Sequence, residues 1–353
     1  MKAMIKVGIF GGTGYMGGEA LRIMLEHPQA ELAWVTGRSG GNIAFYHPNL
    51  YGREVNLIHP DEATPCDVVF LALPTAESIQ VAASFLEKGC RVIDLGAAFR
   101  LKDRKTWEST YNQRHSHWEL VEEAVCGITE LHLEEIRTAR LIANYGCFSS
   151  AAILGLAPLI KARSVDLEKI VVDGLSGTSG VGAELSRAAH HPEIGSNLVP
   201  YNVVNHRHTY EMEQELSLLA RERVTVHFTP TYVPVIRGIL DICHTHYSKS
   251  ITREEVLTMY KDFYHDEPFI KIYDLPKEDD ASWQYRPYPW VSSITGTNYC
   301  FIGLDIDEAR KRIVIFSILD NLGKGGAQAG IENMNVMYGL DRKTGLSKLG
   351  SHP

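Results

Sequence analysis

Short apolar runs alternate with amphipathic stretches along the first part of the chain. The apolar runs have the length and composition of buried strands, and they lie at 6–10, 31–36, 67–73, 91–95 and 141–144. Helical periodicity follows several of them, at 17–26, 76–88 and 151–163. Alternating strands and helices predict an α/β fold with a doubly wound parallel sheet and right-handed crossovers.

The pattern changes after about residue 168. Segments rich in β-formers lie at 169–173, 224–228, 239–245 and 312–317, with longer helical stretches at 210–222 and 253–265. This predicts an α+β domain with a mostly antiparallel sheet. A last helix, at about 327–338, is expected to pack on the first domain. We therefore expect one domain formed by residues 1–147 with 321–353 and a second formed by residues 148–320.

Composition narrows the class of protein. The chain has 353 residues, 44% hydrophobic and 22% charged, as in an ordinary globular protein with two cores. A net charge of −8 without a long basic run argues against nucleic-acid binding. No apolar run is long enough to cross a membrane. The six cysteines show no metal-ligand spacing, so we expect reduced thiols in a cytoplasmic protein without a bound metal.

A glycine-rich segment directly follows the first predicted strand. Gly11-Gly-Thr-Gly-Tyr-Met-Gly17 contains G-x-G-x-x-G and opens a predicted helix. Glycines at these positions let backbone N–H groups approach a pyrophosphate at the helix N-terminus. A lone match is weak, but this one lies between a strand and a helix, where the motif works. The alternative is a purely structural turn.

The residues after the second strand distinguish the two nicotinamide cofactors. NAD enzymes usually place an acidic residue there, whereas this chain has Gly37, Arg38 and Ser39. An arginine and a serine at this point favour the 2′-phosphate of NADP. The alternative is that Arg38 is a solvated loop charge.

Cys147 is the candidate nucleophile. It lies on a glycine-containing turn directly ahead of a predicted helix, and the positive end of a helix dipole stabilises a thiolate. Isolated cysteines are usually small buried hydrophobes, which is our interpretation of Cys66, Cys90, Cys243 and Cys300. Cys126 is left undecided. A thiolate together with a hydride carrier predicts chemistry through an acyl-thioester.

Proton transfer requires a second group. His206 and His208 alternate in a segment expected to be extended, just before a helix. A fragment of a metal site and ordinary surface histidines are the alternatives. Arg100 follows the fourth strand, at the sheet edge where ligands of such folds bind, and a guanidinium there suits a phosphate-bearing substrate. A surface salt bridge is its alternative. Arg100 and Asn144 are the candidate substrate-binding residues.

A second glycine-rich loop, Ser176-Gly-Thr-Ser-Gly-Val-Gly182, follows a strand of the second domain. It does not open a domain, so we do not interpret it as a second dinucleotide site. Ser176 and Gly180 are instead candidates for the floor beneath the nicotinamide.

Several collinear motifs over nearly the whole chain resemble one enzyme family. The segments GGTGYMGGE, GCFSS, SGTSGVGAE, NHRHTYEMEQE, FTPTYVPVIRGIL and DNLGKGGAQAGIENMNVMYGL are similar, in this order, to N-acetyl-γ-glutamyl-phosphate reductases. The resemblance implies an aspartate-semialdehyde dehydrogenase-like fold: a Rossmann-type domain and an α+β substrate and oligomerisation domain. It also implies a cytoplasmic homodimer or homotetramer that uses NADPH.

The resemblance also implies roles for individual residues. Cys147 would attack an acyl phosphate, Arg100 would hold the departing phosphate, and His206 or His208 would transfer a proton. Contacts to NADP would come from Gly11, Thr13, Gly14, Tyr15, Met16, Gly37, Arg38, Ser39 and Asn321. Asn321 is predicted to contact NADP on the basis of this resemblance alone.

The substrate interpretation rests on smaller details. The sequences at 182–184, 190–193 and 295–299 favour the branch acting on glutamyl or aminoadipyl phosphates linked to the carrier protein LysW, in lysine or arginine biosynthesis. FTPTYVP favours the alternative, a free acetylated substrate. Tyr145, Ser149 and Ser150 stand where the family usually has other residues. Aspartate-semialdehyde dehydrogenase is a further alternative, against which the paired histidines argue. A non-catalytic NADP sensor is another, against which both Cys147 and the paired histidines argue.

Overall fold

The computed structural model describes residues 4–247, 249–274, 288–346 and 349–351. The chain divides into two compact units. Unit 1 contains residues 1–146, 182–184 and 326–347, and unit 2 contains 147–181, 185–325 and 348–353. Residues 347, 348, 352 and 353 of the predicted C-terminal part of the first domain lie outside the described residues.

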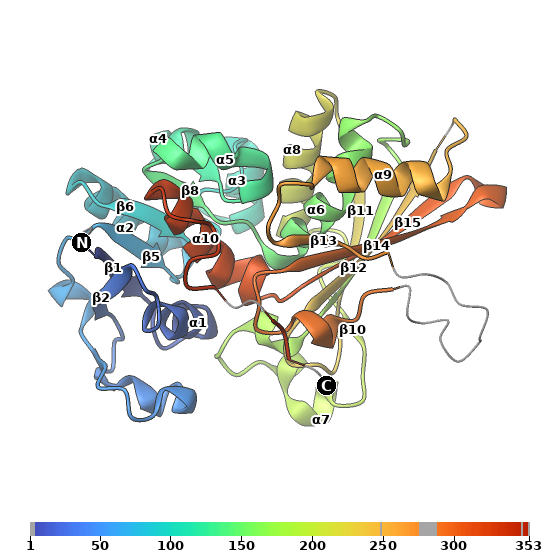
Figure 1. The fold of residues 1–353 in the computed structure, drawn as a ribbon. Coiled ribbons are helices and arrows are strands. Elements are labelled where there is room, and N and C mark those ends of the chain that lie inside the picture. The colour runs from blue at the N-terminus through green and yellow to red at the C-terminus, as the bar shows by residue number, and fades with distance from the viewer. Residues whose placement is uncertain (1–3, 248, 275–287, 347–348, 352–353) are drawn as a thin grey trace. The chain divides into compact units, whose positions relative to one another are not determined.

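Unit 1 is built on a six-stranded parallel sheet (Figure 1). Its strands, in spatial order, are β2 (Ala30–Val35), β1 (Ile5–Phe10), β5 (Val68–Leu71), β6 (Arg91–Asp94), β8 (Leu141–Ala143) and β7 (Val125–Cys126). The strand order runs outward in both directions from β1 and β5. Right-handed crossovers then place α1 (Tyr15–Met24) and α2 (Thr75–Glu87) on opposite faces. The predicted doubly wound sheet is confirmed.

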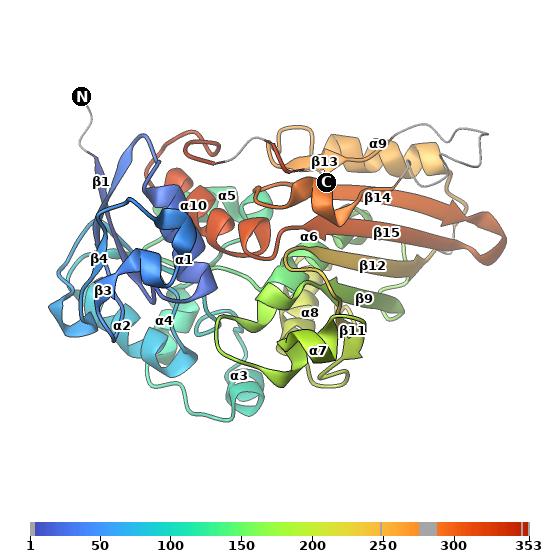
Figure 2. The same ribbon diagram turned by 90° about the horizontal axis from the view of Figure 1, so that it is seen from below.

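The remaining elements of unit 1 are mostly short. They are β3 (Gly41–Asn42), β4 (Asn56–Leu57), α3 (Arg104–Tyr111), α4 (Trp118–Glu123), α5 (Thr129–Thr138) and α10 (Gln328–Met337). The C-terminal helix α10 contacts α5, α1 and β6, and both views show it beside α1 (Figures 1 and 2). A segment far along the chain therefore completes the core of unit 1.

Unit 2 contains a seven-stranded mixed sheet, whose central strands lie side by side in Figure 2. Its strands, in spatial order, are β10 (Val199–Pro200), β11 (Val226–Tyr232), β9 (Ile170–Ser176), β12 (Ile239–His246), β15 (Arg312–Leu319), β14 (Cys300–Asp307) and β13 (Ile270–Ile272). Two pairings, β9 with β11 and β13 with β14, are parallel, and the other four are antiparallel. The predicted, mostly antiparallel sheet is confirmed.

The helices of unit 2 cover one face of this sheet. They are α6 (Cys147–Lys161), α8 (Arg207–Ala220) and α9 (Arg253–Phe263), while the short α7 (His191–Ile194) lies elsewhere (Figure 1). Buried positions alternate along β9 and β12, as expected for strands with one covered face. Helix α6 contacts β12, β15, α8 and α9, so the helix that begins at Cys147 is central to the core of unit 2.

Helix α6 contains a proline, and the hydrogen bond that this proline removes from the helix is replaced by one from a side chain. Pro158 lacks an N–H, which leaves the carbonyl of Leu154 without its usual helical donor. The hydroxyl of Tyr264 donates to that carbonyl at 2.6 Å, and the hydroxyl of Tyr260 donates to the carbonyl of Gly155 at 2.5 Å. Helix α9 and its end therefore hold α6 in place.

Candidate active site

The glycine loop after β1 is folded so tightly that side chains are excluded. Gly11 has φ +79°, and a Cβ there would lie 2.2 Å from the carbonyl oxygen of Ala72. A Cβ at Gly17 would lie 2.2 Å from the carbonyl oxygen of Gly11. Gly14 is the N-cap of α1 and has no side chain to occupy the first turn, which holds Tyr15, Met16 and Gly17. This loop has the shape of an anion-binding helix N-terminus.

The loop after β2 meets this turn. A Cβ at Gly37 would lie 2.9 Å from Cγ2 of Thr13, so the two loops are in contact at the carboxyl edge of the sheet. Arg38 follows and forms an ion pair with Glu77, in the first turn of α2. Both side chains are exposed, Arg38 at 73%. Arg38 is therefore paired rather than solvated alone, and Ser39 follows it on the surface.

Arg100 is buried, which excludes the surface salt bridge considered as its alternative. It is 5% exposed, its Nε donates to the carbonyl of Asn144 at 2.8 Å, and Nη2 donates to the carbonyl of Leu95 at 3.3 Å. The hydroxyl of Tyr145 donates back to the carbonyl of Arg100 at 3.2 Å. Arg100 thus binds the main chain that leads into Cys147.

Asn144 is held by the C-terminal part of unit 1. Its Nδ2 donates to the carbonyl of Gly326 at 3.1 Å, and its Oδ1 accepts from Nδ2 of Asn333 at 3.2 Å. Because all these groups are buried, their hydrogen bonds hold the backbone from Asn144 to Gly146 in one position. The two candidate substrate residues are therefore joined by a hydrogen bond, from the guanidinium of Arg100 to the backbone carbonyl of Asn144.

Cys147 is the first residue of α6 rather than a residue ahead of it, because the helix begins four residues earlier than predicted. Its side chain is half-buried. Gly325 packs directly on it, since a Cβ at position 325 would lie 2.7 Å from the Cβ of Cys147. The other five cysteines are also free thiols; burial raises the pKa of Cys66 to about 12 and holds that of Cys243 well above its usual value.

The structure corrects the predicted setting of the two histidines. His206 is the N-cap of α8, and its Nδ1 accepts the backbone N–H of His208 at 3.2 Å. His208 lies inside the helix, not in an extended segment. A histidine that caps the helix through Nδ1 carries its remaining proton on Nε2 when the ring is neutral. His206 therefore presents Nε2–H as a donor.

Both rings are buried among aromatic side chains. Phe148 contacts His206 and His208 edge to face, each with centroids 5.9 Å apart, and Phe228 contacts His206 at 5.2 Å. Burial, and to a smaller extent the charge of Arg207, lower the pKa of His206 to about 4, although Glu211 acts in the opposite direction. His206 is accordingly neutral at pH 7.

Two tyrosines that we did not predict lie beside these histidines. The rings of Tyr201 and Tyr232 are stacked, with centroids 4.1 Å apart and planes 1° apart, and Tyr201 contacts His206 edge to face. Burial raises the pKa of both, and the charge of Cys147 contributes to both shifts. Tyr201 and Tyr232 lie in separate segments of the chain, and nothing in the residues next to either one indicates that they meet. Only the fold reveals this pair.

The second glycine loop and Asn321 meet in unit 2. Oδ1 of Asn321 accepts the N–H of Gly238 at 2.7 Å, and its Nδ2 donates to Oγ of Ser179 at 2.9 Å. A Cβ at Gly180 would lie 3.2 Å from Oγ of Ser176, the last residue of β9. Asn321, Ser176 and Gly180 therefore form one cluster in unit 2.

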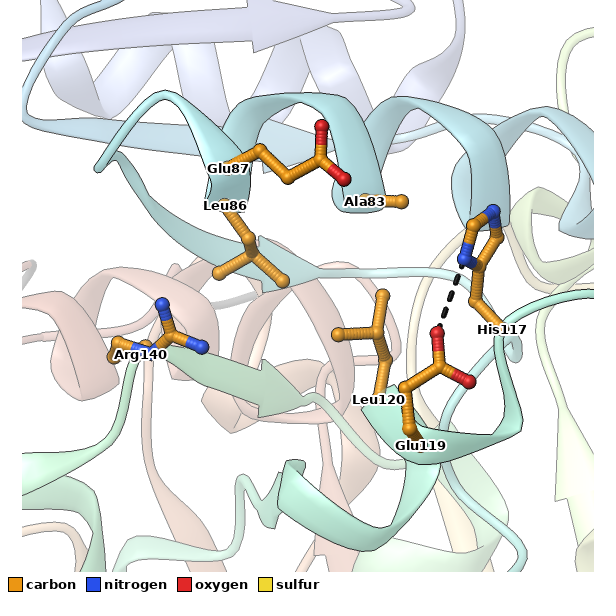
Figure 3. Close-up of a pocket in the computed structure, with 7 residues that line it drawn as sticks. All are labelled: Ala83, Leu86, Glu87, His117, Glu119, Leu120 and Arg140. Carbon is orange, nitrogen blue, oxygen red and sulfur yellow. Dashed lines mark hydrogen bonds and ion pairs between the residues drawn. The ribbon is translucent and has the colours of Figure 1, made fainter.

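Unit 1 contains a small pocket (Figure 3). Its volume is about 130 Å³, and it is lined by Ala83, Leu86, Glu87, His117, Glu119, Leu120 and Arg140. Leu86 and Glu87 end α2, and Arg140 precedes β8, so the pocket lies toward the amino ends of the strands. Ligands of open parallel sheets bind at the carboxyl ends, and we do not assign this pocket to the site.

Comparison with known proteins gives the family. Residues 6–139 match the family model described as semialdehyde dehydrogenase, NAD binding domain, and residues 147–321 match semialdehyde dehydrogenase, dimerisation domain. The N-acetyl-γ-glutamyl-phosphate reductase of Pelotomaculum thermopropionicum is 42% identical, with 99% of both chains covered. That of Desulforamulus reducens is 39% identical over 99% of this chain and 100% of the relative. The chain belongs to the N-acetyl-γ-glutamyl-phosphate reductase family.

Solved structures agree on the fold. Aspartate semialdehyde dehydrogenase II from Vibrio cholerae superimposes with a TM-score of 0.70 at 18% identity, covering 96% of this chain and 99% of that one. The Candida albicans enzyme with NADP gives 0.64 at 16% identity, covering 95% and 99%. The predicted aspartate-semialdehyde dehydrogenase-like fold is confirmed. Among the described residues, no helix is long and apolar enough to span a membrane.

Proposed function

We propose that the chain is an NADPH-dependent reductase that converts N-acetyl-γ-glutamyl phosphate into the semialdehyde and phosphate. The observation that carries this is Cys147 at the first position of α6, in a member of this reductase family. The relatives' names favour the free acetylated substrate, which was the alternative interpretation, over the carrier-linked one. Linkage to LysW stays a prediction, as do cytoplasmic location and the choice between homodimer and homotetramer.

The residues of unit 1 fit a dinucleotide. The tight turn at Gly11, the bare N-cap at Gly14 and the contact between Thr13 and Gly37 leave the backbone of Tyr15 and Met16 accessible to a pyrophosphate. Arg38 and Ser39 would hold a 2′-phosphate, for which Arg38 must exchange its partner Glu77. Ser176, Gly180 and Asn321, which form one cluster in unit 2, stay predicted contacts of the cofactor. When bound, NADPH supplies the hydride that reduces the thioester.

The protein's own groups account for the rest of the reaction. The thiolate of Cys147 attacks the acyl carbon, the bond to the phosphate oxygen breaks, and a thioester remains. We assign the departing negative charge to Arg100, whose buried guanidinium stands at the carboxyl edge of the sheet. After reduction, the tetrahedral oxyanion re-forms its carbonyl, the carbon–sulfur bond breaks, and the thiolate of Cys147 returns.

His206 suits the donor role in these steps better than the base role. Its Nδ1 is occupied by the N–H of His208, and the neutral ring carries its proton on Nε2. A neutral imidazole that donates through Nε2–H stabilises a developing oxyanion without bringing a buried charge. His208, in the first turn of α8, is the second candidate for proton transfer.

The test is phosphate-dependent reduction of NADP⁺ by N-acetyl-L-glutamate semialdehyde, the reverse direction. Cys147→Ser should lower the rate by about 10³-fold or more. Cys66→Ser is the matched control, because the raised pKa of Cys66 keeps that half-buried thiol protonated. Near-normal turnover of Cys147→Ser would refute the thioester mechanism, and turnover only of carrier-linked or aspartyl substrates would refute the substrate assignment.

A further inference from the structure

Glu211 is a fully buried acid that joins the two helices bearing the candidate catalytic side chains. Its carboxylate accepts a hydrogen bond from Oγ of Ser149 at 2.5 Å, and neither side chain is exposed. Ser149 lies in the first turn of α6, which begins at Cys147. Glu211 lies in the second turn of α8, whose N-cap is His206. The bond therefore ties the start of one helix to the start of the other.

The surroundings of this bond are apolar and closely packed. Phe148, between Cys147 and Ser149 in sequence, contacts both histidine rings and Phe228. Gly174 on β9 makes room for these rings, because a Cβ there would lie 2.7 Å from an atom of Phe148 and 2.7 Å from an atom of Phe228. A hydrogen bond to a carboxylate is strong in such a medium, and its loss is costly.

Glu211 also influences the charge on His206. Among the described residues, the titratable or charged groups that face His206 are Arg207, His208 and Glu211 from α8, and Tyr201 from the segment after β10. Burial and Arg207 favour the neutral ring, whereas Glu211 is the group that favours the protonated one. Ser149 carries no charge, so a substitution there removes the hydrogen bond to Glu211 and leaves the charges around His206 unchanged.

We propose that Glu211 is a positioning residue, which acts through Ser149 to fix the start of α6, with Cys147, relative to the start of α8, with His206. This inference rests on the proposed function, but one of its measurements, the alkylation of Cys147, requires no substrate. A buried acid that served only to stabilise the fold would show the same hydrogen bond, so the experiment must separate positioning from stability.

The variants are Glu211→Gln, Ser149→Ala and Ser149→Thr, with Glu213→Gln as the control. Glu213 lies on the same helix, and its carboxylate also accepts a hydrogen bond, from the backbone N–H of Val226 at 3.1 Å. Three quantities are measured: kcat and KM in the reverse reaction across pH, the rate of Cys147 alkylation by iodoacetamide, and the melting temperature.

We expect Ser149→Ala and Glu211→Gln to lower kcat about tenfold or more, with KM within about threefold of wild type, and to change the alkylation rate by a similar factor. Ser149→Thr, which keeps the hydroxyl, should restore most of kcat. Glu211→Gln should also move the acidic limb of the pH profile to lower pH, because His206 loses its only favourable carboxylate among these facing groups, whereas Ser149→Ala should leave that limb in place.

The proposal is wrong if Ser149→Ala keeps kcat and the alkylation rate within about twofold of wild type, or if Glu213→Gln impairs both as strongly. It is also wrong if a lower melting temperature accompanies the loss and Ser149→Thr does not restore the rate. Alkylation needs no substrate. If wild type were inactive on the acetylated semialdehyde, the proposed function would fail while the alkylation rates still decided the role of Glu211.

Discussion

Gly325 leaves no space for a side chain beside Cys147. A Cβ at position 325 would lie 2.7 Å from the Cβ of Cys147 and 2.8 Å from Cδ1 of Leu319. These distances are shorter than ordinary van der Waals contact, so the backbone after β15 sets the space available to the nucleophile. A residue almost 180 positions away along the chain thus defines one wall around the thiol.

The first prediction follows from this contact. Gly325→Ala should destabilise the protein by about 1–3 kcal/mol through overpacking and should slow iodoacetamide alkylation of Cys147 several-fold. Gly330→Ala is the matched control, because its Cβ would meet Leu95 Cδ2 at 2.7 Å in the core of the other unit. Both variants should lose stability in urea unfolding, but only Gly325→Ala should change the alkylation rate. Equal alkylation rates for the two would contradict the prediction.

The second prediction separates capping from catalysis at His206. Asn is a good N-cap, so His206→Asn should keep the stability of wild type while it loses the Nε2 donor, and kcat should fall about 100-fold. His206→Ala should show the same loss of kcat and, in addition, a loss of about 1 kcal/mol of stability. Steady-state kinetics and thermal unfolding measure the two effects. A kcat for His206→Asn within threefold of wild type would exclude the donor role.

The third prediction concerns the choice of cofactor. Glu77 forms an ion pair with Arg38 and so competes with a 2′-phosphate for its guanidinium. Glu77→Gln should therefore lower the Kd for NADPH about two- to fivefold, because an exposed ion pair contributes about 0.2–1 kcal/mol. Arg38→Ala should weaken NADPH binding and leave NADH binding nearly unchanged. Glu26→Gln, which breaks the exposed pair with Arg53, is the control. Fluorescence titration measures the affinities, and an unchanged NADPH affinity in Arg38→Ala would place the 2′-phosphate elsewhere.

The fourth prediction is a pH dependence of stability. Asp241 on β12 is completely buried, and desolvation raises its pKa well above the usual value. Its contribution to stability is therefore complete below the pKa of the unfolded chain. As pH rises from there toward the raised pKa of the folded state, this carboxyl's contribution to the free energy of unfolding falls by about 1.4 kcal/mol per pH unit.

Asp241→Asn removes this titration. Compared with wild type, the variant should lose less stability between pH 5 and pH 8 in urea unfolding experiments. His244→Asn on the same strand is a useful contrast: burial lowers the pKa of His244, so loss of this group should change the pH dependence of stability in the opposite direction. If wild type and Asp241→Asn showed parallel stability curves, the carboxyl would titrate normally and its burial would not matter.

The local pattern of hydrophobic and polar residues was sufficient to predict elements that are buried along their whole length or that bury every second residue. Five of the six parallel strands of unit 1 were predicted within a few residues, because strands buried on both faces form continuous apolar runs; β7 was missed. The strands β9, β12 and β15 were predicted within a few residues because burial of one sheet face imposes a period of two. The short helix α3 was missed because Trp107 is its only buried residue, so it has no apolar stripe. Strand β14 carried a usable alternating signal that we did not recognise.

The sequence by itself determined the glycine turn, the thiol at a helix start and the family, because each depends on neighbouring residues or on several motifs in a fixed order. Only the tertiary structure decided which distant groups meet. Ser149 and Glu211 are 62 positions apart, and Asn321 and Gly238 are 83 apart. The tertiary structure likewise decided that Tyr201 and Tyr232 stack on each other and that Arg100 is buried. The physical reason is that desolvation, hydrogen-bond partners and close contacts are properties of packed elements, and spacing along the chain does not specify them.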